Sequence, residues 1–250
     1  MPKLVILGSA NAVPDEQHEN THLALLGHNR TLLIDCVNSP IVRLERAGVN
    51  LDTLTDLILT HYHPDHVSGV PSLLMGMWLL GRTKPLNIYG LKHTLKRVKA
   101  MMEAYDWQTW PRFFPVLFTT VPEQTMTLVL EQEEWRIFSS PVNHMIPNIG
   151  LRIEFLQKKV VAYSSDTEPC PAVIQLAQGA EVLIHEAAGN SPGHTSPAQA
   201  GEIAQEANVK SLYLIHYPAR EARSESLIAE AASTFDGQVV LAEDFMKLEF

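Results

Sequence analysis

The chain has 250 residues, of which 46% are hydrophobic and 19% are charged, and its net charge is -9. This composition can form a hydrophobic core, so it excludes a disordered or fibrous chain, and the length fits a single domain spanning 1–250. The excess of acidic side chains makes the chain a poor candidate for sliding along nucleic acid by counterion release.

Short β-rich runs alternate with helical patterns along the chain. Strands are predicted at 4–7, 23–26, 31–35 and 57–60, and then at 135–139, 151–155, 160–164, 182–185, 212–216 and 239–241. Helices are predicted at 40–47, 71–80, 93–105, 171–179, 197–207 and 221–235. Because helices follow strands in both halves, the pattern favours an α/β sandwich over an all-β barrel. The aromatic stretch 107–123 is interpreted as a packed connector or as a wall near the site.

Neither the N-terminus nor the rest of the chain carries a targeting or membrane signal. The N-terminal apolar run is too short for a signal peptide, and the apolar segment 70–81 is too short to span a bilayer. We therefore expect a soluble, cytoplasmic protein without a membrane partner. Cys36 and Cys170 lie far apart and form no CxxC pair, which argues against disulfides and against a Cys-rich zinc site.

A dense cluster of histidines follows the predicted strand 57–60. Three histidines and one carboxylate lie within six residues, at His61, His63, Asp65 and His66. A tight turn can direct His61 and His63 to one side and Asp65 and His66 to the other, so that two neighbouring metal ions would each receive two ligands. Without a cation, this many polar groups would be costly to bury together.

Three further donors end later strands, at His144, Asp166 and His216. Since residues at strand ends can meet at one sheet edge, they can complete the two metal sites. The pattern His-x-His-x-Asp-His, then His, Asp and His, resembles the metallo-β-lactamase fold hydrolases over nearly the whole chain. The resemblance implies a four-layer αββα sandwich of two mixed β-sheets flanked by helices.

The resemblance also implies a ligand assignment. One ion is bound by His61, His63 and His144, the other by Asp65, His66 and His216, with Asp166 bridging both. Asp35 corresponds to a residue that supports the metal loop. A cysteine at the bridging position would suggest a true β-lactamase, whereas the aspartate at 166 implies a symmetric pair of sites that suits phosphate oxygens. Zinc is the expected metal, with manganese or iron as alternatives.

The segments around His185 and His194-Thr195-Ser196 resemble the ribonuclease Z branch of the superfamily. This resemblance implies a phosphodiesterase in which the metals hold the attacking hydroxide. Asp65 would orient or deprotonate the water, and His194 would protonate the leaving alkoxide as the general acid. As an alternative, His194 would serve only as a surface or helix-capping residue.

The chain departs from ribonuclease Z between His144 and Asp166. Ribonuclease Z inserts a long basic arm there that grips tRNA, whereas here the interval holds only a predicted strand pair. The sequence therefore favours a small or single-stranded phosphodiester, such as a cyclic nucleotide, a cyclic phosphate or an RNA end. One alternative is a tRNA 3′-processing endoribonuclease, and another is a lactonase or thioesterase with Tyr217 and the aromatic stretch 107–118 as walls of an acyl pocket. A third is a non-catalytic module that binds metal or nucleic acid. Relatives are often dimers, and the Met-rich segment 70–80 is a candidate homodimer contact.

Overall fold

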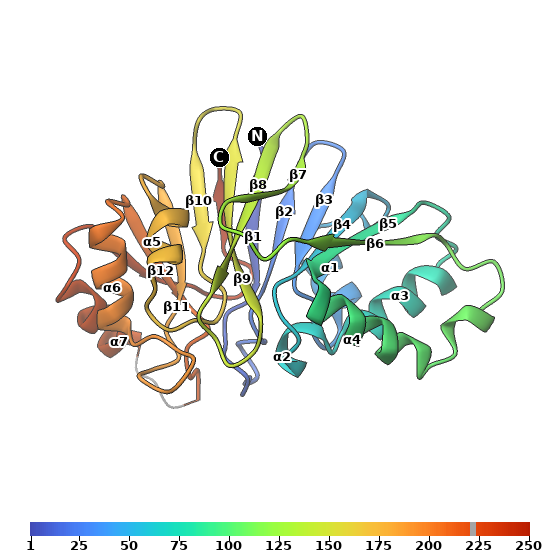
Figure 1. The fold of residues 1–250 in the computed structure, drawn as a ribbon, viewed down its shortest axis with the longest axis horizontal. Coiled ribbons are helices and arrows are strands. Elements are labelled where there is room, and N and C mark those ends of the chain that lie inside the picture. Colours follow the sequence, from blue (N-terminus) through green and yellow to red (C-terminus); the bar gives the residue numbers. More distant parts are fainter. Residues whose placement is uncertain (221–223) are drawn as a thin grey trace.

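Two mixed seven-stranded sheets pack face to face at the centre of the protein (Figure 1). The structure, a computed structural model, describes residues 1–220 and 224–250. In spatial order the first sheet consists of β14 (Lys247–Glu249), β1 (Lys3–Gly8), β2 (His22–Leu26), β3 (Thr31–Ile34), β4 (Leu54–Leu59), β5 (Leu86–Leu91) and β6 (Val116–Val121). The second consists of β13 (Gln238–Leu241), β12 (Ser211–Ile215), β11 (Val182–Glu186), β10 (Val160–Tyr163), β9 (Asn148–Phe155), β8 (Trp135–Val142) and β7 (Thr127–Glu131).

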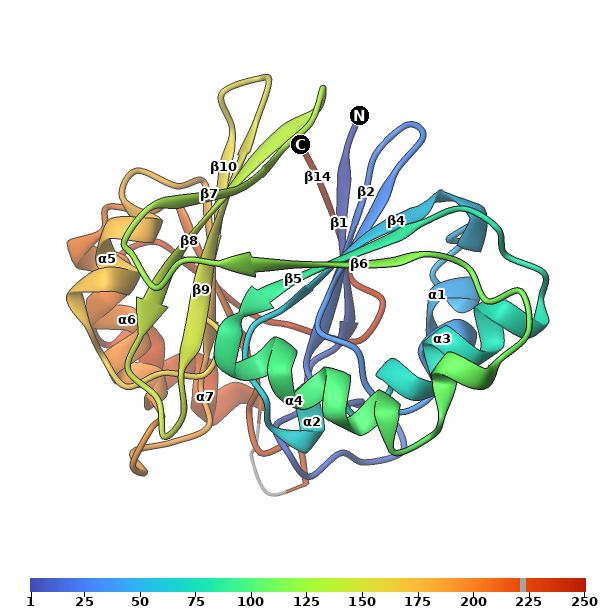
Figure 2. The ribbon, with the colours of Figure 1, turned by 45° about the vertical axis from the view of Figure 1, so that its right-hand side comes forward.

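Helices cover both outer faces of this pair of sheets, as Figure 2 shows. The first sheet is covered by α1 (Pro40–Arg46), α3 (Val70–Leu79) and α4 (Lys92–Glu103), with the short α2 (Pro64–Val67) at its end and single 3-10 turns at Leu51–Thr53 and Trp107–Thr109. The second is covered by α5 (Pro171–Ala177), α6 (Pro197–Glu206) and α7 (Ser224–Ala232). The prediction of a four-layer αββα sandwich is confirmed. Positions 221–223, which the sequence assigned to the last helix, lie outside the described residues.

Three apolar layers hold the sandwich together, and β1 shows how one strand serves two of them. Leu4 and Ile6 face the other sheet, whereas Val5 and Leu7 face the helices of the first sheet. A strand buried on both faces reads as a continuous apolar run, which is why KLVILG shows no alternation between apolar and polar residues. The third layer fills the space between the second sheet and α5, α6 and α7.

The structure adds four strands that the sequence did not predict, namely β5, β6, β7 and β14. The interpretation of 107–123 as a connector or site wall is wrong in part, because β6 lies inside it and extends the first sheet by pairing with β5. The aromatic side chains that precede β6 pack into the layer beneath α3 and α4, and Trp78 of α3 stacks on Trp110.

The apolar segment 70–80 forms α3, as predicted, but only one of its faces is in the core. Met75, Leu79 and Leu80 are exposed, so the suggested homodimer contact there stays a prediction. Within the described ranges, no helix combines the length and apolarity needed to cross a bilayer.

The strands that precede the candidate ligands all end at one edge of the sandwich, at the level of α2 (Figure 1). β8 and β10 both pair antiparallel with β9, and β12 runs parallel to β10 through β11, so these three strands end together. At the same edge, the backbone N–H of His216 donates to the carbonyl of Ser9, which follows β1 of the first sheet. This edge therefore joins both sheets and carries the candidate site.

Candidate metal centre

The loop that follows β4 is held in place by one buried carboxylate. Asp35, at the end of β3, accepts hydrogen bonds from the backbone N–H of Thr60 at 2.8 Å and from the Thr60 hydroxyl at 2.9 Å. It also lies 2.8 Å from Nδ1 of His66, at the other end of the loop. If Nδ1–H donates to Asp35, Nε2 of His66 is left free to face the cluster. Asp35 thus fixes both ends of the loop while remaining outside the cluster itself.

The remaining donors come from the second sheet, and two of them are oriented in the same way. His144 lies in the loop between β8 and β9, with its Nδ1 2.8 Å from the carbonyl of Gly193. His216 follows β12, with its Nδ1 3.2 Å from the hydroxyl of Thr21. Asp166 follows β10, and its backbone carbonyl accepts from the side-chain amide of Asn148. Both histidines therefore present Nε2 toward the centre of the cluster.

The seven residues form two groups that share a single carboxylate. His61, His63, His144 and Asp166 offer ligand atoms within 4.8 Å of one another, and so do Asp65, His66, Asp166 and His216. In the first group, Nδ1 of His63 lies 3.1 Å from Nε2 of both His61 and His144. A tetrahedral zinc ion with bonds of about 2.0–2.1 Å separates its ligands by about 3.3 Å, so these nitrogens have the spacing that such an ion requires. The donor set fits a divalent cation.

Asp166 is buried among three imidazoles. Its Oδ2 lies 3.3 Å from Nε2 of His66, 3.3 Å from Nε2 of His216 and 3.7 Å from Nε2 of His61. Its Oδ1 is buried and has no hydrogen-bond partner among the described residues. Burial opposes ionisation, but His216 and His66 hold the pKa of Asp166 well below its usual range. An ionised carboxylate with one oxygen unsatisfied is suited to a bridging ligand.

Burial keeps two of the neighbouring histidines neutral, as metal ligation requires. It lowers the pKa of His216 to about 4 and moves the pKa of His61 well below its ordinary value. His66 behaves differently. Burial lowers its pKa, but Asp166 and Asp35 outweigh this effect and raise it well above the ordinary value. The two carboxylates lie on opposite ring nitrogens of His66, Asp35 at Nδ1 and Asp166 at Nε2.

Three residues at the site have a left-handed backbone. The φ angles are 62° at Asp35, 54° at Ser165 and 54° at His216. Non-glycine residues with positive φ are uncommon, and they cluster at functional sites where the surrounding structure enforces them. Each of these residues lies at or next to a strand end, so the turn out of the sheet directs the following side chains toward the cluster.

His194 lies at the rim of the cluster and is paired with a buried carboxylate. Its ring stacks on His216 at a centroid distance of 5.8 Å and meets His144 edge-on at 5.2 Å. Its Nδ1 is 2.9 Å from Oε1 of Glu186. Glu186 is fully buried at the end of β11, where it also accepts from the N–H groups of Thr167 and Ala188.

The pairing changes the acidity of both groups. The hydrogen bond that Nδ1–H of His194 donates to Glu186 raises the pKa of His194 despite its partial burial. Burial raises the pKa of Glu186 to about 7, although His194 opposes this effect. His194 is thereby held as a proton donor at the rim of the metal cluster, with Nε2 directed away from Glu186.

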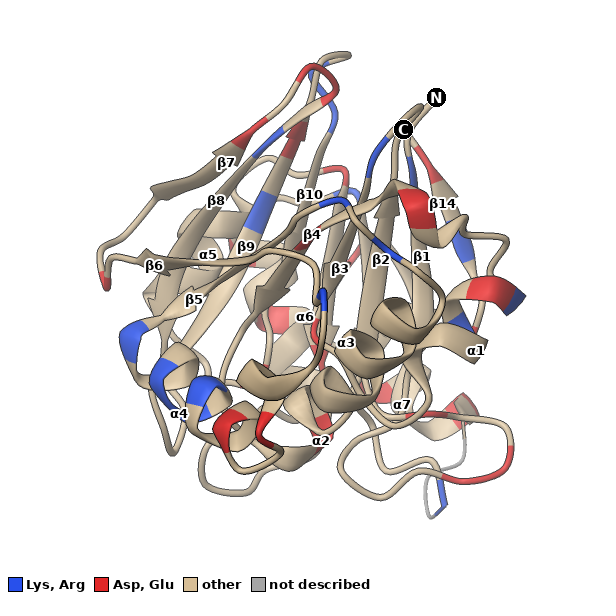
Figure 3. Cartoon of the chain, turned by 90° about the vertical axis from the view of Figure 1, so that its right-hand side faces the viewer, with Lys and Arg blue, Asp and Glu red and all other residues tan. Residues whose placement is uncertain are grey.

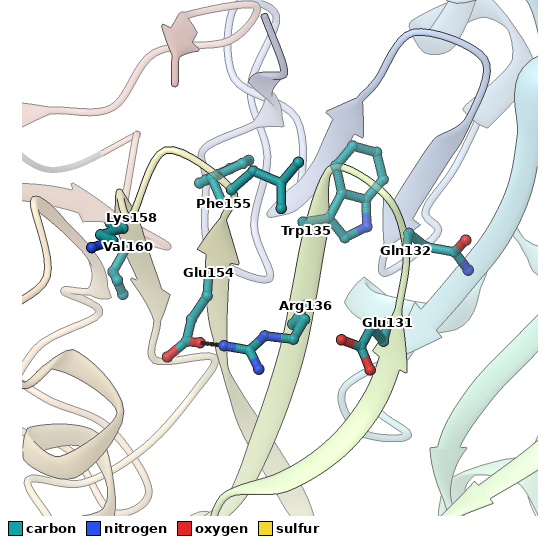
Figure 4. Close-up of a pocket in the computed structure, with 9 residues that line it drawn as sticks. Glu131, Gln132, Trp135, Arg136, Glu154, Phe155, Lys158 and Val160 are labelled. Atoms are coloured by element: carbon teal, nitrogen blue, oxygen red, sulfur yellow. Dashed lines mark hydrogen bonds and ion pairs between the residues drawn. The ribbon is translucent and has the colours of Figure 1, made fainter.

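Two open hollows adjoin the cluster on the side of the second sheet. One, of about 400 Å³, is lined by His144, Glu168 and Gly193, and the other, of about 410 Å³, includes His194. A further cavity of about 410 Å³ surrounds Trp135, where Arg136 pairs with Glu154 (Figure 4). That cavity lies among the hairpin ends of the second sheet and includes none of the cluster residues, so the candidate site is at the two hollows.

The structure brings all seven sequence-predicted ligands together and places His194 beside them. Sequence reasoning gave no role to Glu186, although a carboxylate that ends the apolar strand VLIHE was a usable signal. Tyr217 does not line an acyl pocket, because it is buried and its hydroxyl donates to the carbonyl of Ala242. The other feature that motivated a lactonase or thioesterase, the aromatic stretch 107–118, packs into the apolar layer beneath α3 and α4.

Comparison with known proteins places this geometry in a family. Residues 30–217 match the family described as "Beta-lactamase superfamily domain". The chain belongs to the beta-lactamase superfamily. The matched range contains all seven clustered donors and also His194 and Glu186. A fold of this family with such a His/Asp cluster indicates divalent-metal binding, and the protein is a metal-dependent hydrolase.

Full-length relatives support the same assignment. Ribonuclease Z from Methanothermobacter thermautotrophicus is 28% identical over 305 aligned positions, which cover 100% of this chain and 97% of the relative. The metallo-β-lactamase fold protein YhfI from Bacillus subtilis has a TM-score of 0.81 at 24% identity, with 100% and 99% of the two chains covered. The short form of human tRNase Z has a TM-score of 0.77 at 22% identity, with 99% and 98% covered. These two structures show that the fold is the same along the whole chain.

Asp35→Ala is expected to weaken divalent-metal affinity by about 10–100-fold, because it removes the acceptor that orients His66 and the start of the loop. The matched control is Asp56→Ala, which removes another buried aspartate from β4, at the end of the strand away from the loop. Both variants should lower the melting temperature, but only the first should change metal affinity in competition with a fluorescent chelator. Equal metal affinity in the two variants would contradict the role given to Asp35.

Proposed function

We propose that the protein hydrolyses phosphodiester bonds with two divalent metal ions bound at the cluster. The observation that carries this proposal is the position of His194. Its Nδ1 lies 2.9 Å from Oε1 of Glu186, and its ring stacks on His216 of the second group and meets His144 of the first group edge-on, where it can deliver a proton to a leaving group. Hydrolysis of a phosphodiester releases an alkoxide that needs such a proton.

Each ion would be held by one group of donors, with Asp166 shared between them. We propose zinc, because imidazole nitrogens predominate among the donors, and manganese or iron would suit the same set. When bound, two such ions neutralise the charge on the phosphate oxygens and lower the pKa of water.

The remaining chemistry is assigned to protein side chains. Asp65 would orient the attacking water and accept its proton, since its partly exposed carboxylate lies 3.5 Å from Nε2 of His66 at the second group. His194 would donate a proton from Nε2 to the leaving oxygen. Glu186 would hold the His194 ring in place through Nδ1 and stabilise its protonated form.

The substrate that we propose is a small or single-stranded phosphodiester, such as a cyclic nucleotide, a cyclic phosphate or an RNA end. Only β9, a four-residue turn and β10 lie between the loop of His144 and Asp166, which leaves no room for the basic arm of ribonuclease Z. The alignment with ribonuclease Z of Methanothermobacter thermautotrophicus runs over 305 positions against the 250 residues of this chain, so it contains positions that this chain does not fill.

Asp166→Ala should remove both metal ions together, because this carboxylate belongs to both donor groups. His216→Ala should reduce the metal content by one ion per chain, from the second group. The control is His28→Ala, which removes an exposed histidine outside the cluster and should retain the metal content of the unmodified protein. Elemental analysis of the purified proteins measures all three, and two ions retained in Asp166→Ala would refute the bridging role.

The proposed reaction class is tested with a substrate panel. The zinc- and manganese-loaded protein should turn over bis(p-nitrophenyl) phosphate and at least one 2′,3′- or 3′,5′-cyclic nucleotide, and chelation should abolish both activities. Acyl-homoserine lactones and glutathione thioesters should not be hydrolysed. Turnover of the lactone or thioester alone would overturn the proposal in favour of carboxyl-centred chemistry.

His194→Ala should discriminate between leaving groups. For a cyclic nucleotide, whose alkoxide needs a proton, kcat should fall by about 10²–10⁴-fold. For bis(p-nitrophenyl) phosphate the loss should be far smaller, because p-nitrophenolate departs without protonation. Glu186→Gln should also lower kcat more for the cyclic nucleotide than for bis(p-nitrophenyl) phosphate, but by a smaller factor than His194→Ala. If both substrates lose activity equally at unchanged metal content, His194 is not the general acid.

A further inference from the structure

Exposed basic side chains gather on the outer face of α4, although the protein as a whole is acidic. Between positions 67 and 102 the sequence contains six Lys or Arg residues and no Asp or Glu, although the whole chain has a net charge of -9. Four of the six lie on α4 as Lys92, Lys96, Arg97 and Lys99, and all four are exposed. Figure 3 shows the Lys and Arg positions of α4 as blue bands on the helix.

Three of these cations form a line. Lys92, Lys96 and Lys99 are spaced i, i+4 and i+7, which places them on one face of the helix over a length of about 10 Å. Within 1–220 and 224–250, none of the three forms an ion pair with a carboxylate. Lys99 lies over the ring of Phe118 on the neighbouring β6, with its Nζ 4.7 Å from the ring centroid. The line therefore presents charge to solvent that is not neutralised within the described protein.

This line begins beside the loop 60–66, which carries His61, His63, Asp65 and His66 and is called the metal loop below. β4 and β5 are parallel neighbours, and Leu59 pairs with Gly90. The chain therefore leaves the sheet at Thr60 and at Leu91 side by side, at the strand spacing of about 4.8 Å. Lys92, the first residue of α4, follows directly. The hollows beside His144 and His194 are lined by loops of the second sheet, whereas α4 covers the first sheet. A nucleic-acid strand that lies across the cluster can therefore contact the hollows on one side and α4 on the other.

The opposite border of the site has the opposite charge. The segment that follows β1 carries Asp15, Glu16 and Glu19, and it adjoins His216 through the bridge between Ala10 and Tyr217. Arg220, which donates to the carbonyl of Pro14, offsets one of these three charges, so the segment keeps an acidic excess that favours the approach of a polyanion from the side of α4. Two carboxylates lie near α4. Glu123 is close enough to His93, in the first turn, to act against the lowering of its pKa by burial, and Glu103 is the last residue of the helix. The three lysines lie between these carboxylates, so their face of the helix remains basic.

We propose that the Lys92–Lys96–Lys99 line binds the phosphate backbone of a single-stranded nucleic acid whose scissile bond lies at the metal cluster. This inference rests on the proposed phosphodiesterase activity and narrows its substrate to a strand end longer than one nucleotide. α4 would then supply part of the backbone contact that the missing arm supplies in ribonuclease Z. Such contacts are insensitive to base sequence and sensitive to salt.

The test compares two triple variants of the metal-loaded protein. Lys92→Gln/Lys96→Gln/Lys99→Gln neutralises the line on α4. The control Lys84→Gln/Lys158→Gln/Lys247→Gln changes the net charge equally at exposed lysines outside α4. The binding probe is a fluorescein-labelled ten-nucleotide single strand with phosphorothioate links that resist cleavage, and affinity is measured by anisotropy across a salt series.

The α4 variant should bind the strand about 100-fold more weakly at 0.1 M salt, and its slope of log affinity against log salt should fall by about 2, or about 0.7 per phosphate contact. In the control variant, both the affinity for the strand and the salt slope should stay close to those of the unmodified protein. Turnover of bis(p-nitrophenyl) phosphate should be the same in both variants and in the unmodified protein, because this substrate does not reach α4. An unmodified protein that does not bind the strand, or equal losses in the two variants, would overturn the inference. Loss of the proposed function would appear separately, as an unmodified protein without phosphodiester turnover.

Discussion

The architecture of the site depends on the burial of Asp166 among imidazoles from both sheets. Its carboxylate meets His66 and His61 from the loop after β4 and His216 from the end of β12. Burying an ionised carboxylate with an unsatisfied oxygen is costly unless opposite charge is close. A divalent cation bound by the surrounding imidazoles would supply that charge, and the position of His66 among them depends on Asp35. The two sheets are therefore joined at this edge by electrostatics as well as by the apolar layer between them.

This constraint explains why the ligands could be predicted from sequence while their supports could not. The loop 60–66 is local, and the later donors each end a strand that is visible as an apolar run, so spacing and residue type were sufficient. Glu186 acts through His194, eight residues further on, and its role appears only when β11 and the following loop bring the two within 2.9 Å. The left-handed backbone at Ser165 and His216 is likewise imposed by the surrounding structure. It could not be predicted from the sequence, because neither position is a glycine.

The fold shows the same division between local and long-range information. β1 and β4 are strongly apolar and were predicted, whereas β5 contains Asn87 and Gly90, which ordinarily weaken a strand. In the structure Asn87 donates to Asp56 on β4, and a Cβ added at Gly90 would lie 3.0 Å from the carbonyl of Leu59, so both residues suit contacts with the neighbouring strand. β6 and β7 are edge strands with exposed side chains, and the three residues of β14 pair with β1 from the far end of the chain. Such strands depend on partners that a local pattern cannot reveal.

Net charge proves to be a weaker guide to the substrate than charge placement. At physiological ionic strength, interactions between exposed charges are screened beyond about 8 Å, so carboxylates spread over a chain of this size contribute little to the potential at α4. The electrostatic potential at a bound phosphate is set by the charged groups within that distance. These groups are acidic on one side of the site and basic on the other. The acidic segment that follows β1 and the basic face of α4 border the same edge of the sandwich. An acidic protein of this fold can therefore act on a nucleic acid, provided that the strand approaches from the side of α4. The orientation of the substrate then follows from the fold itself, because β4 and β5 place the metal loop and the start of α4 next to each other.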